Sequence, residues 1–130
     1  MRQMNSGRNT MTSSYDEQLR KMFQDLQAKM IATKEKIEEG EEVCRNEEKA
    51  IKVASVVKGR LEELSDSNKV YRAVGRSFLL VDRKSELSRQ DAVTKAAEEK
   101  IVAINKQKEY LQKSLVDAEQ NLREMVMARP

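Results

Sequence analysis

The stretch KVYRAVGRSFLLVD, residues 69–82, interrupts a sequence that otherwise reads as helix. Two short runs rich in β-branched and aromatic residues flank Gly75, and glycine readily adopts the positive φ that a tight turn requires. We therefore predict a β-hairpin over about residues 69–82. Strand alternation places apolar side chains on both faces, which is typical of a sheet covered on two sides. The residues that carry this prediction are Val70, Tyr71, Val74, Gly75, Phe78, Leu79, Leu80 and Val81.

Long helices are predicted on both sides of the hairpin. Apolar residues recur at alternating steps of four and three from Leu19 to Ala54, a stripe that passes through Phe23 and Met30. Residues with this average spacing form one narrow line along a helix, which lets the helix wind around another one. A second stripe of similar length begins at Leu87. The two stripes predict that the helices pair with each other.

The first helix is predicted at about residues 14–64. Ser14 and Glu17 have the spacing of a capping box at its start. The turn-forming cluster SDSN, residues 65–68, is expected to end it. Residues 1–13 are polar and show no period, so we expect them to form a flexible tail.

The second helix is predicted at about residues 83–128, with Asp82 or Ser85 as its cap. Two stripes joined by a short insert are most simply satisfied when the chain folds back on itself. The predicted fold is therefore mainly α, a long antiparallel coiled-coil hairpin of two helices joined by a short β-hairpin. Residues 14–130 are expected to form a single domain.

Composition excludes several classes of protein. With no histidine and only Cys44, the chain cannot form an internal disulfide, a Cys/His zinc cluster or a histidine-activated nucleophile. Cys44 lies on the first stripe, where a small buried apolar role is expected. No apolar run exceeds four residues, far fewer than a membrane span needs. We expect a soluble cytoplasmic protein without metal or other cofactor.

The apolar hairpin raises a physical difficulty. The helices use their apolar stripes on each other, so no part of this chain is expected to cover the hairpin. Burying a Val, Leu or Phe side chain is worth about 1.5 to 3 kcal/mol, and a two-stranded sheet alone is marginal in water. The hairpin is therefore predicted to pair with hairpins of other chains in an assembly.

The stretch VYRAVGRSFLLVD between two coiled-coil arms resembles the β-class subunits of prefoldin. The segments MFQDLQAKMIAT and KEYLQKSLVDAEQNLREMVMAR resemble eukaryotic members of that class. The resemblance extends from about Tyr15 to Arg129. It implies a hetero-hexamer of two α-class and four β-class subunits whose hairpins form a double β-barrel. It further implies capture of unfolded actin and tubulin without ATP, and their delivery to the cytosolic chaperonin.

The resemblance also implies that substrate is held by partly unwound, apolar tips of the coiled coils. Adjacent apolar residues, such as Met22 and Phe23, cannot all lie on one narrow stripe, so some are expected to be exposed. The residues alone are explained slightly better by side chains that close the end of the coiled coil, whereas the resemblance favours substrate binding. The tip residues are Leu19, Met22, Phe23, Leu26, Leu122, Met125, Val126 and Met127.

Three other functions are alternatives to the chaperone interpretation. A structural coiled-coil adaptor or tether explains both helices but leaves the apolar hairpin unexplained. A nucleic-acid binder would need a basic block before the heptads, and the first eight residues contain only Arg2 and Arg8. The 25 basic and 22 acidic residues are interleaved, which also argues against nucleic acid. An enzyme is the least expected of the three.

Overall fold

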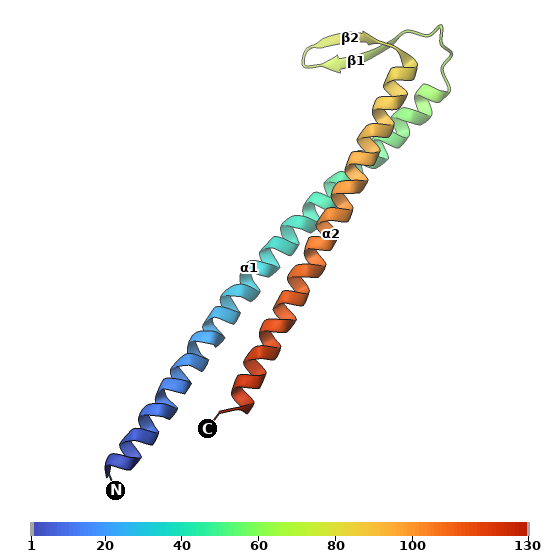
Figure 1. Ribbon diagram of the computed structural model, residues 1–130. Helices are drawn as coiled ribbons and strands as arrows, with labels where there is room; N and C mark the ends of the chain where they lie inside the picture. Colours follow the sequence, from blue (N-terminus) through green and yellow to red (C-terminus); the bar gives the residue numbers. More distant parts are fainter. Residues whose placement is uncertain (1, 130) are drawn as a thin grey trace. The chain divides into compact units, whose positions relative to one another are not determined.

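The computed structural model describes the backbone of residues 2–129 and the side chains of residues 13–129. Its elements follow in the order α1 (Arg2–Glu62), β1 (Val70–Val74), β2 (Ser77–Val81) and α2 (Arg83–Met127) (Figure 1). Two long helices joined by a small antiparallel hairpin confirm the predicted fold class. No helix in the described part of the chain combines the length and the apolar character needed to cross a membrane.

The described residues form two compact units. Residues 40–105 contain the β-hairpin and are called the hairpin unit, whereas residues 2–39 and 106–129 are called the terminal unit. In the hairpin unit, Lys100 of α2 pairs with Glu47 of α1 at 3.3 Å. In the terminal unit, Lys29 of α1 donates to the carbonyl oxygen of Ser114 in α2 at 3.4 Å. The two helices therefore contact each other within each unit.

The first helix begins earlier than predicted. It starts at Arg2, so Ser14 and Glu17 lie inside α1 and do not cap it. Residues 2–13 contain no proline, and extending an existing helix adds one hydrogen bond for each residue ordered. The predicted flexibility of residues 1–13 stays a prediction. Residue 1 of this predicted tail and residue 130 of the predicted domain lie outside the described residues.

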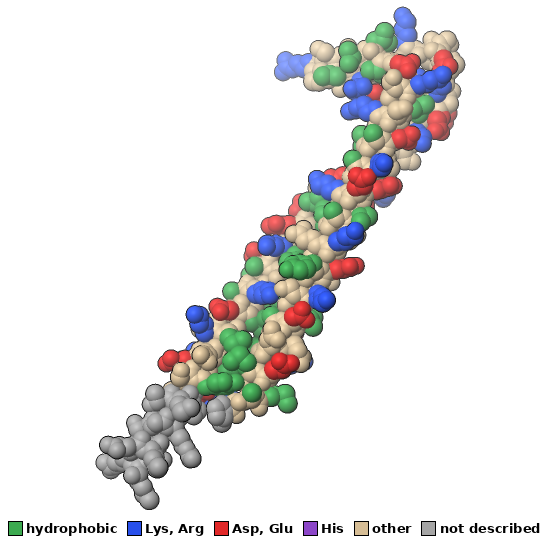
Figure 2. All heavy atoms as spheres, in the orientation of Figure 1, with side chains coloured by type: hydrophobic (Ala, Val, Ile, Leu, Met, Phe, Trp, Pro, Cys, Tyr) green, Lys and Arg blue, Asp and Glu red, His purple; other side chains and the backbone are tan. Residues whose placement is uncertain are grey.

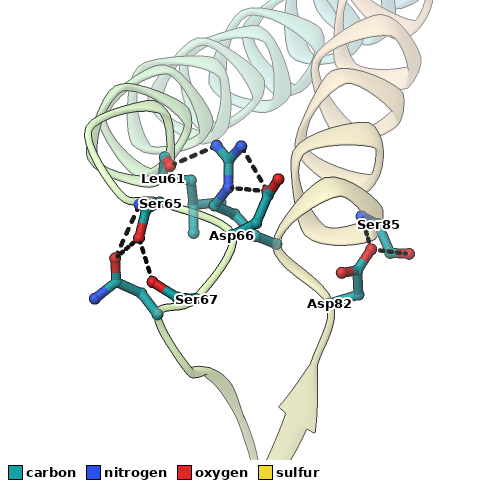
Figure 3. A network of polar contacts seen from close by, with 8 residues as sticks. Leu61, Ser65, Asp66, Ser67, Asp82 and Ser85 are labelled. Carbon is teal, nitrogen blue, oxygen red and sulfur yellow. Dashed lines mark hydrogen bonds and ion pairs between the residues drawn. The ribbon is translucent and has the colours of Figure 1, made fainter.

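The loop after α1 confirms the predicted stop signal. The helix ends at Glu62, and the side-chain oxygen of Asn68 accepts a 2.8 Å hydrogen bond from the backbone nitrogen of Ser65 (Figure 3). At the start of α2, Asp82 accepts a 3.2 Å bond from the backbone nitrogen of Ser85. Asp82 is therefore the N-cap of α2, and Ser85 supplies the backbone N–H that the cap binds.

Arg83 links the two helix ends. Its guanidinium donates to the carbonyl oxygen of Leu61 at 3.1 Å and to Asp66 at 3.0 and 3.2 Å. The Leu61 carbonyl belongs to the last turn of α1, where carbonyls lack partners within the helix. The hydrogen bond from Arg83, followed by the charge of Lys84, holds the pKa of Asp66 below its ordinary value.

The β-hairpin has the predicted turn. Val70 lies opposite Val81 and Val74 lies opposite Ser77, which leaves a two-residue loop. Gly75 in this loop has a φ of 60°, and no other described residue has a positive φ. A positive φ at only the first loop position is the pattern of a type II′ turn, which matches the twist of the flanking strands.

A buried carboxylate ties the hairpin to α2. Glu86 is only 5% exposed, and it accepts hydrogen bonds from Arg72 of β1 and Arg89 of α2, each at 3.0 Å. Burial alone would raise the pKa of Glu86, but these two charged donors outweigh it and hold the pKa below its ordinary value. Val70 and Val81 are half-buried. The expectation that nothing in the chain covers the hairpin is therefore wrong at the end of one face, where Val70, Arg72 and Val81 lie near α2.

The helix contacts use small side chains. Ala54, Leu61 and Ala97 are the buried apolar residues of the described side chains, and all three lie in the hairpin unit. At Gly40 of α1, an added Cβ would lie 3.0 Å from Cγ2 of Ile104 in α2. Gly40 thus allows the helices to approach closely there, a role that its low helix propensity did not indicate.

The predicted stripe is confirmed along α2 and in most of α1. Every stripe position of α2 is buried or half-buried: Leu87, Gln90, Thr94, Ala97, Ile101, Ile104, Lys108, Leu111, Leu115, Ala118, Leu122 and Met125. In α1 the prediction is wrong at Phe23 and Met30, which are exposed, whereas Met22 is half-buried. On a helix of about 3.6 residues per turn, Met22 lies about 20° from buried Thr33, and Phe23 about 80°.

Two glycines allow a matched test of the turn. Nothing lies within 4 Å of a Cβ added at Gly75 or at Gly59, so only backbone conformation distinguishes them. We expect Gly75→Ala to destabilise the hairpin by about 1 to 2 kcal/mol because alanine resists a positive φ. Gly59→Ala, inside α1, should stabilise the helix by up to about 1 kcal/mol. Hydrogen exchange of hairpin and helix amides measures both effects, and equal protection of the hairpin in both variants would contradict the turn assignment.

The lowered pKa of Glu86 predicts a pH dependence. A depressed folded pKa stabilises the fold fully above the unfolded value of about 4.3, and this stabilisation is lost as pH falls through the folded value. We expect Glu86→Gln to lower the free energy of unfolding by about 2 kcal/mol near pH 7. The difference from the parent chain should shrink below about pH 4, as measured by chemical denaturation at several pH values. A difference that does not change with pH would contradict the prediction.

Candidate functional site: two exposed apolar surfaces

The first apolar surface is one face of the β-hairpin. Residues directly opposite each other in an antiparallel pair point to the same face, and Tyr71 lies opposite Leu80 and Ala73 opposite Phe78. All four are exposed, and Phe78 has 75% of its surface open to solvent. We call these residues, Tyr71, Ala73, Phe78 and Leu80, the open face. Figure 2 shows hydrophobic side chains on the surface of the hairpin.

The opposite face of the hairpin is only partly available. It carries Val70, Arg72 and Val81 at the end near α2, where the Arg72–Glu86 ion pair lies. Toward the turn, Leu79 and Val74 remain exposed. The sheet has two strands, so each strand also has an outer edge without a neighbour among the described residues. The predicted hairpin residues thus divide into a face directed at the chain's own helix and a face directed away.

The second apolar surface lies in the terminal unit, where the predicted tip residues divide in the same way. Five of them, namely Leu19, Met22, Leu26, Leu122 and Met125, are half-buried. Phe23, Val126 and Met127 are exposed, with exposed fractions of 52%, 55% and 87%. The structure therefore makes Phe23, not Met22, the outward residue of that adjacent pair.

Polar contacts close the end of the terminal unit. The Tyr15 hydroxyl donates a 2.6 Å hydrogen bond to the carbonyl oxygen of Met125, which belongs to the last turn of α2. Arg129 pairs with Asp16 at 2.9 Å. Both helices are continuous here, since α2 extends to Met127 and α1 begins at Arg2. Among the described residues, the exposed apolar side chains at this end project from regular helix, and the partly unwound tips implied by the family resemblance stay a prediction.

A shallow groove runs between α1 and α2 in the terminal unit. One depression has a volume of about 390 Å³ and another about 220 Å³, and both are lined by Lys29, Ala118 and Asn121. Tyr110 borders the larger depression, and Met22 borders the smaller one. Ala118, the one small residue of the α2 stripe in this unit, borders both depressions. Lys29 and Tyr110 could not be identified from sequence, because neither residue belongs to an apolar stripe.

Charged clusters offer little for metal chemistry. Among the described residues, no three Cys, Asp or Glu side chains come together as they would around a metal ion. Cys44 is half-buried in α1 of the hairpin unit, in line with its stripe position. Among the described residues, the two apolar surfaces and the groove are the candidates for contact with a partner.

The family model and the relatives that match this chain are all prefoldin subunits. The family model described as prefoldin subunit matches residues 24–129. Probable prefoldin subunit 1 of Caenorhabditis elegans is 44% identical over 114 residues, covering 88% of this chain and 97% of that protein. Prefoldin subunit 1 of Homo sapiens is 35% identical over 119 residues, covering 92% and 98%.

A solved structure supports the fold. The prefoldin beta subunit from Thermococcus strain KS-1 aligns with a TM-score of 0.64 over 82% of this chain and 90% of that one. Its sequence identity of 16% limits the comparison to the fold. The family match covers most of the chain, including the hairpin and all of α2, and the two relatives are matched along nearly their whole lengths. The chain belongs to the prefoldin subunit family.

Proposed function

We propose that the chain is a β-class subunit of a hetero-hexameric, ATP-independent chaperone with two α-class and four β-class subunits. In this proposal the assembly captures unfolded proteins such as actin and tubulin and delivers them to the cytosolic chaperonin. Membership of the prefoldin subunit family implies a prefoldin chaperone complex. The observation that carries the proposal is the apolar open face of the hairpin, which this chain does not cover.

The hairpin is proposed as the surface that joins the subunits. Removing a large apolar side chain from water is worth about 1.5 to 3 kcal/mol, and the open face presents Tyr71, Phe78 and Leu80 together. The outer edges of β1 and β2 add unpaired backbone groups, which favour pairing with further strands. A hairpin from another subunit satisfies both requirements at once.

The apolar surface of the terminal unit is proposed to bind unfolded chains. Met127, Val126 and Phe23 supply exposed apolar contacts on both helices. Methionine is flexible and polarisable, so it can adapt to many different apolar segments. The adjoining groove offers both Lys29 and Met22, which suits substrates of mixed polarity. The chain would act in the cytoplasm by binding alone, without a cofactor, nucleic acid or membrane.

The assembly role can be tested with charged substitutions on the open face. We expect Phe78→Asp with Leu80→Asp to abolish hexamer formation upon co-expression with the partner subunits, because a buried unpaired carboxylate is strongly unfavourable. The mass of the purified complex gives the result. The matched control is Val53→Asp with Val56→Asp, which places the same charges on exposed positions of α1 in the same unit. A normal hexamer from the hairpin variant, or a parent chain found only as a dimer, would instead favour a structural coiled-coil adaptor.

The capture role can be tested in the assembled complex. We expect Phe23→Ser, Val126→Ser and Met127→Ser together to leave the hexamer intact and to reduce suppression of aggregation of unfolded actin severalfold. The control triple, Val53→Ser, Val56→Ser and Val102→Ser, removes similarly exposed apolar groups from the hairpin unit. Light scattering during dilution of denatured actin measures the effect. Equal protection by both triple variants would show that the terminal unit does not capture substrate.

A further inference from the structure

Glu86 is the only buried charged side chain among those that the structure describes. Its two carboxylate oxygens face different elements. Oε2 accepts bonds from Nε and Nη2 of Arg72 in β1, at 3.2 and 3.0 Å. Oε1 accepts bonds from Arg89 at 3.0 Å and from Gln90 at 3.4 Å, one turn further along α2. The carboxylate thus joins the sheet to the helix through separate atoms.

The position of Arg72 in β1 decides which face of the hairpin turns toward α2. Arg72 lies opposite Leu79 and shares its face with Val70 and Val81. Because side chains alternate along a strand, the bond from Arg72 to α2 directs this face inward. The same bond directs Tyr71 and its neighbours on the open face away from the helix.

The covalent connection between the hairpin and α2 is one residue, whose carbonyl oxygen also accepts a helical hydrogen bond from the backbone nitrogen of Glu86 at 2.9 Å. Only Asp82 separates the end of β2 from the start of α2. A single connecting residue leaves its own backbone torsions as a pivot, and Asp82 is fixed on the helix side by its bond to Ser85. The contact between Arg72 and Glu86 lies away from this pivot, so it restrains rotation about it.

We propose that Glu86 is a positioning residue for the assembly hairpin, fixing through Arg72 which face the hairpin presents to partner subunits. The role in assembly rests on the proposed function, whereas the fixed orientation follows from this chain alone. Neutralising Glu86 leaves the guanidinium groups of Arg72 and Arg89 without their common carboxylate. Loss of one partner from a buried charge pair is far more disruptive than loss of an exposed ion pair.

The orientation can be measured on the full-length chain. Spin labels at Arg76→Cys in the turn and Ala92→Cys on α2, in a Cys44→Ser background, report the distance between hairpin and helix within the hairpin unit. We expect a narrow distance distribution in the parent and a clearly broader one in Glu86→Gln. Asp91→Asn is the matched control, because it breaks the exposed 2.8 Å ion pair with Lys58 without touching the hairpin. An equally narrow distribution in Glu86→Gln would overturn the inference.

The consequence for assembly can be measured with the partner subunits. We expect Glu86→Gln and Arg72→Gln each to weaken association about tenfold, while circular dichroism shows unchanged helix content. The double variant should be no weaker than Glu86→Gln alone, because that substitution already removes the contact with Arg72. Additive losses would mean that the two residues act independently, which contradicts the inference.

The two proposals can fail separately. If Phe78→Asp with Leu80→Asp assembles normally, the hairpin is not the assembly surface and the proposed function fails. The spin-label distances in the isolated chain still decide whether Glu86 fixes the hairpin. If the hairpin variant fails to assemble but Glu86→Gln assembles as tightly as the parent, the proposed function stands and the positioning role is refuted.

Discussion

The structure depends on an apolar two-stranded sheet whose open face the chain leaves in water. A sheet of two strands is marginal by itself, and Phe78 and Leu80 gain nothing from exposure. The chain can direct only one face of the hairpin toward its own helix, and it does so through Arg72 and Glu86. The remaining face and both strand edges have no partner among the described residues, which is the physical reason why this protein is proposed to act as one subunit of an assembly.

Few side chains are buried in this protein, although its helices are long. Small residues such as Ala54 and Ala97 are buried between the helices, and Gly40 allows close approach of Ile104. Such contacts bury little area per residue, so stability is spread thinly along the helices. In the terminal unit the bond from Tyr15 to α2 closes the helix end. Capture of unfolded chains, as proposed, would then use side chains that project from regular helix.

Local chemistry explains the parts of the fold that could be predicted from sequence. A positive φ at Gly75 and the helix cap at Asp82 depend on neighbouring residues alone. The stripe of α2 was also predictable, because a regular helix places residues by spacing. Prediction failed at the start of α1: the alternation through Phe23 and Met30 is the more apolar one, yet the helix turns Met22 inward and leaves Phe23 and Met30 exposed.

The amino-acid sequence by itself determined two paired helices and a hairpin with its turn, because both follow from short-range spacing of apolar residues and glycine. Only the tertiary structure decided that Glu86, among 22 acidic residues, is the one that Arg72 binds. The chain has 25 basic residues, so the sequence alone does not tell which basic residue pairs with which distant acidic residue. The choice among them is made by three-dimensional proximity, which here also determines the face of the hairpin that remains open.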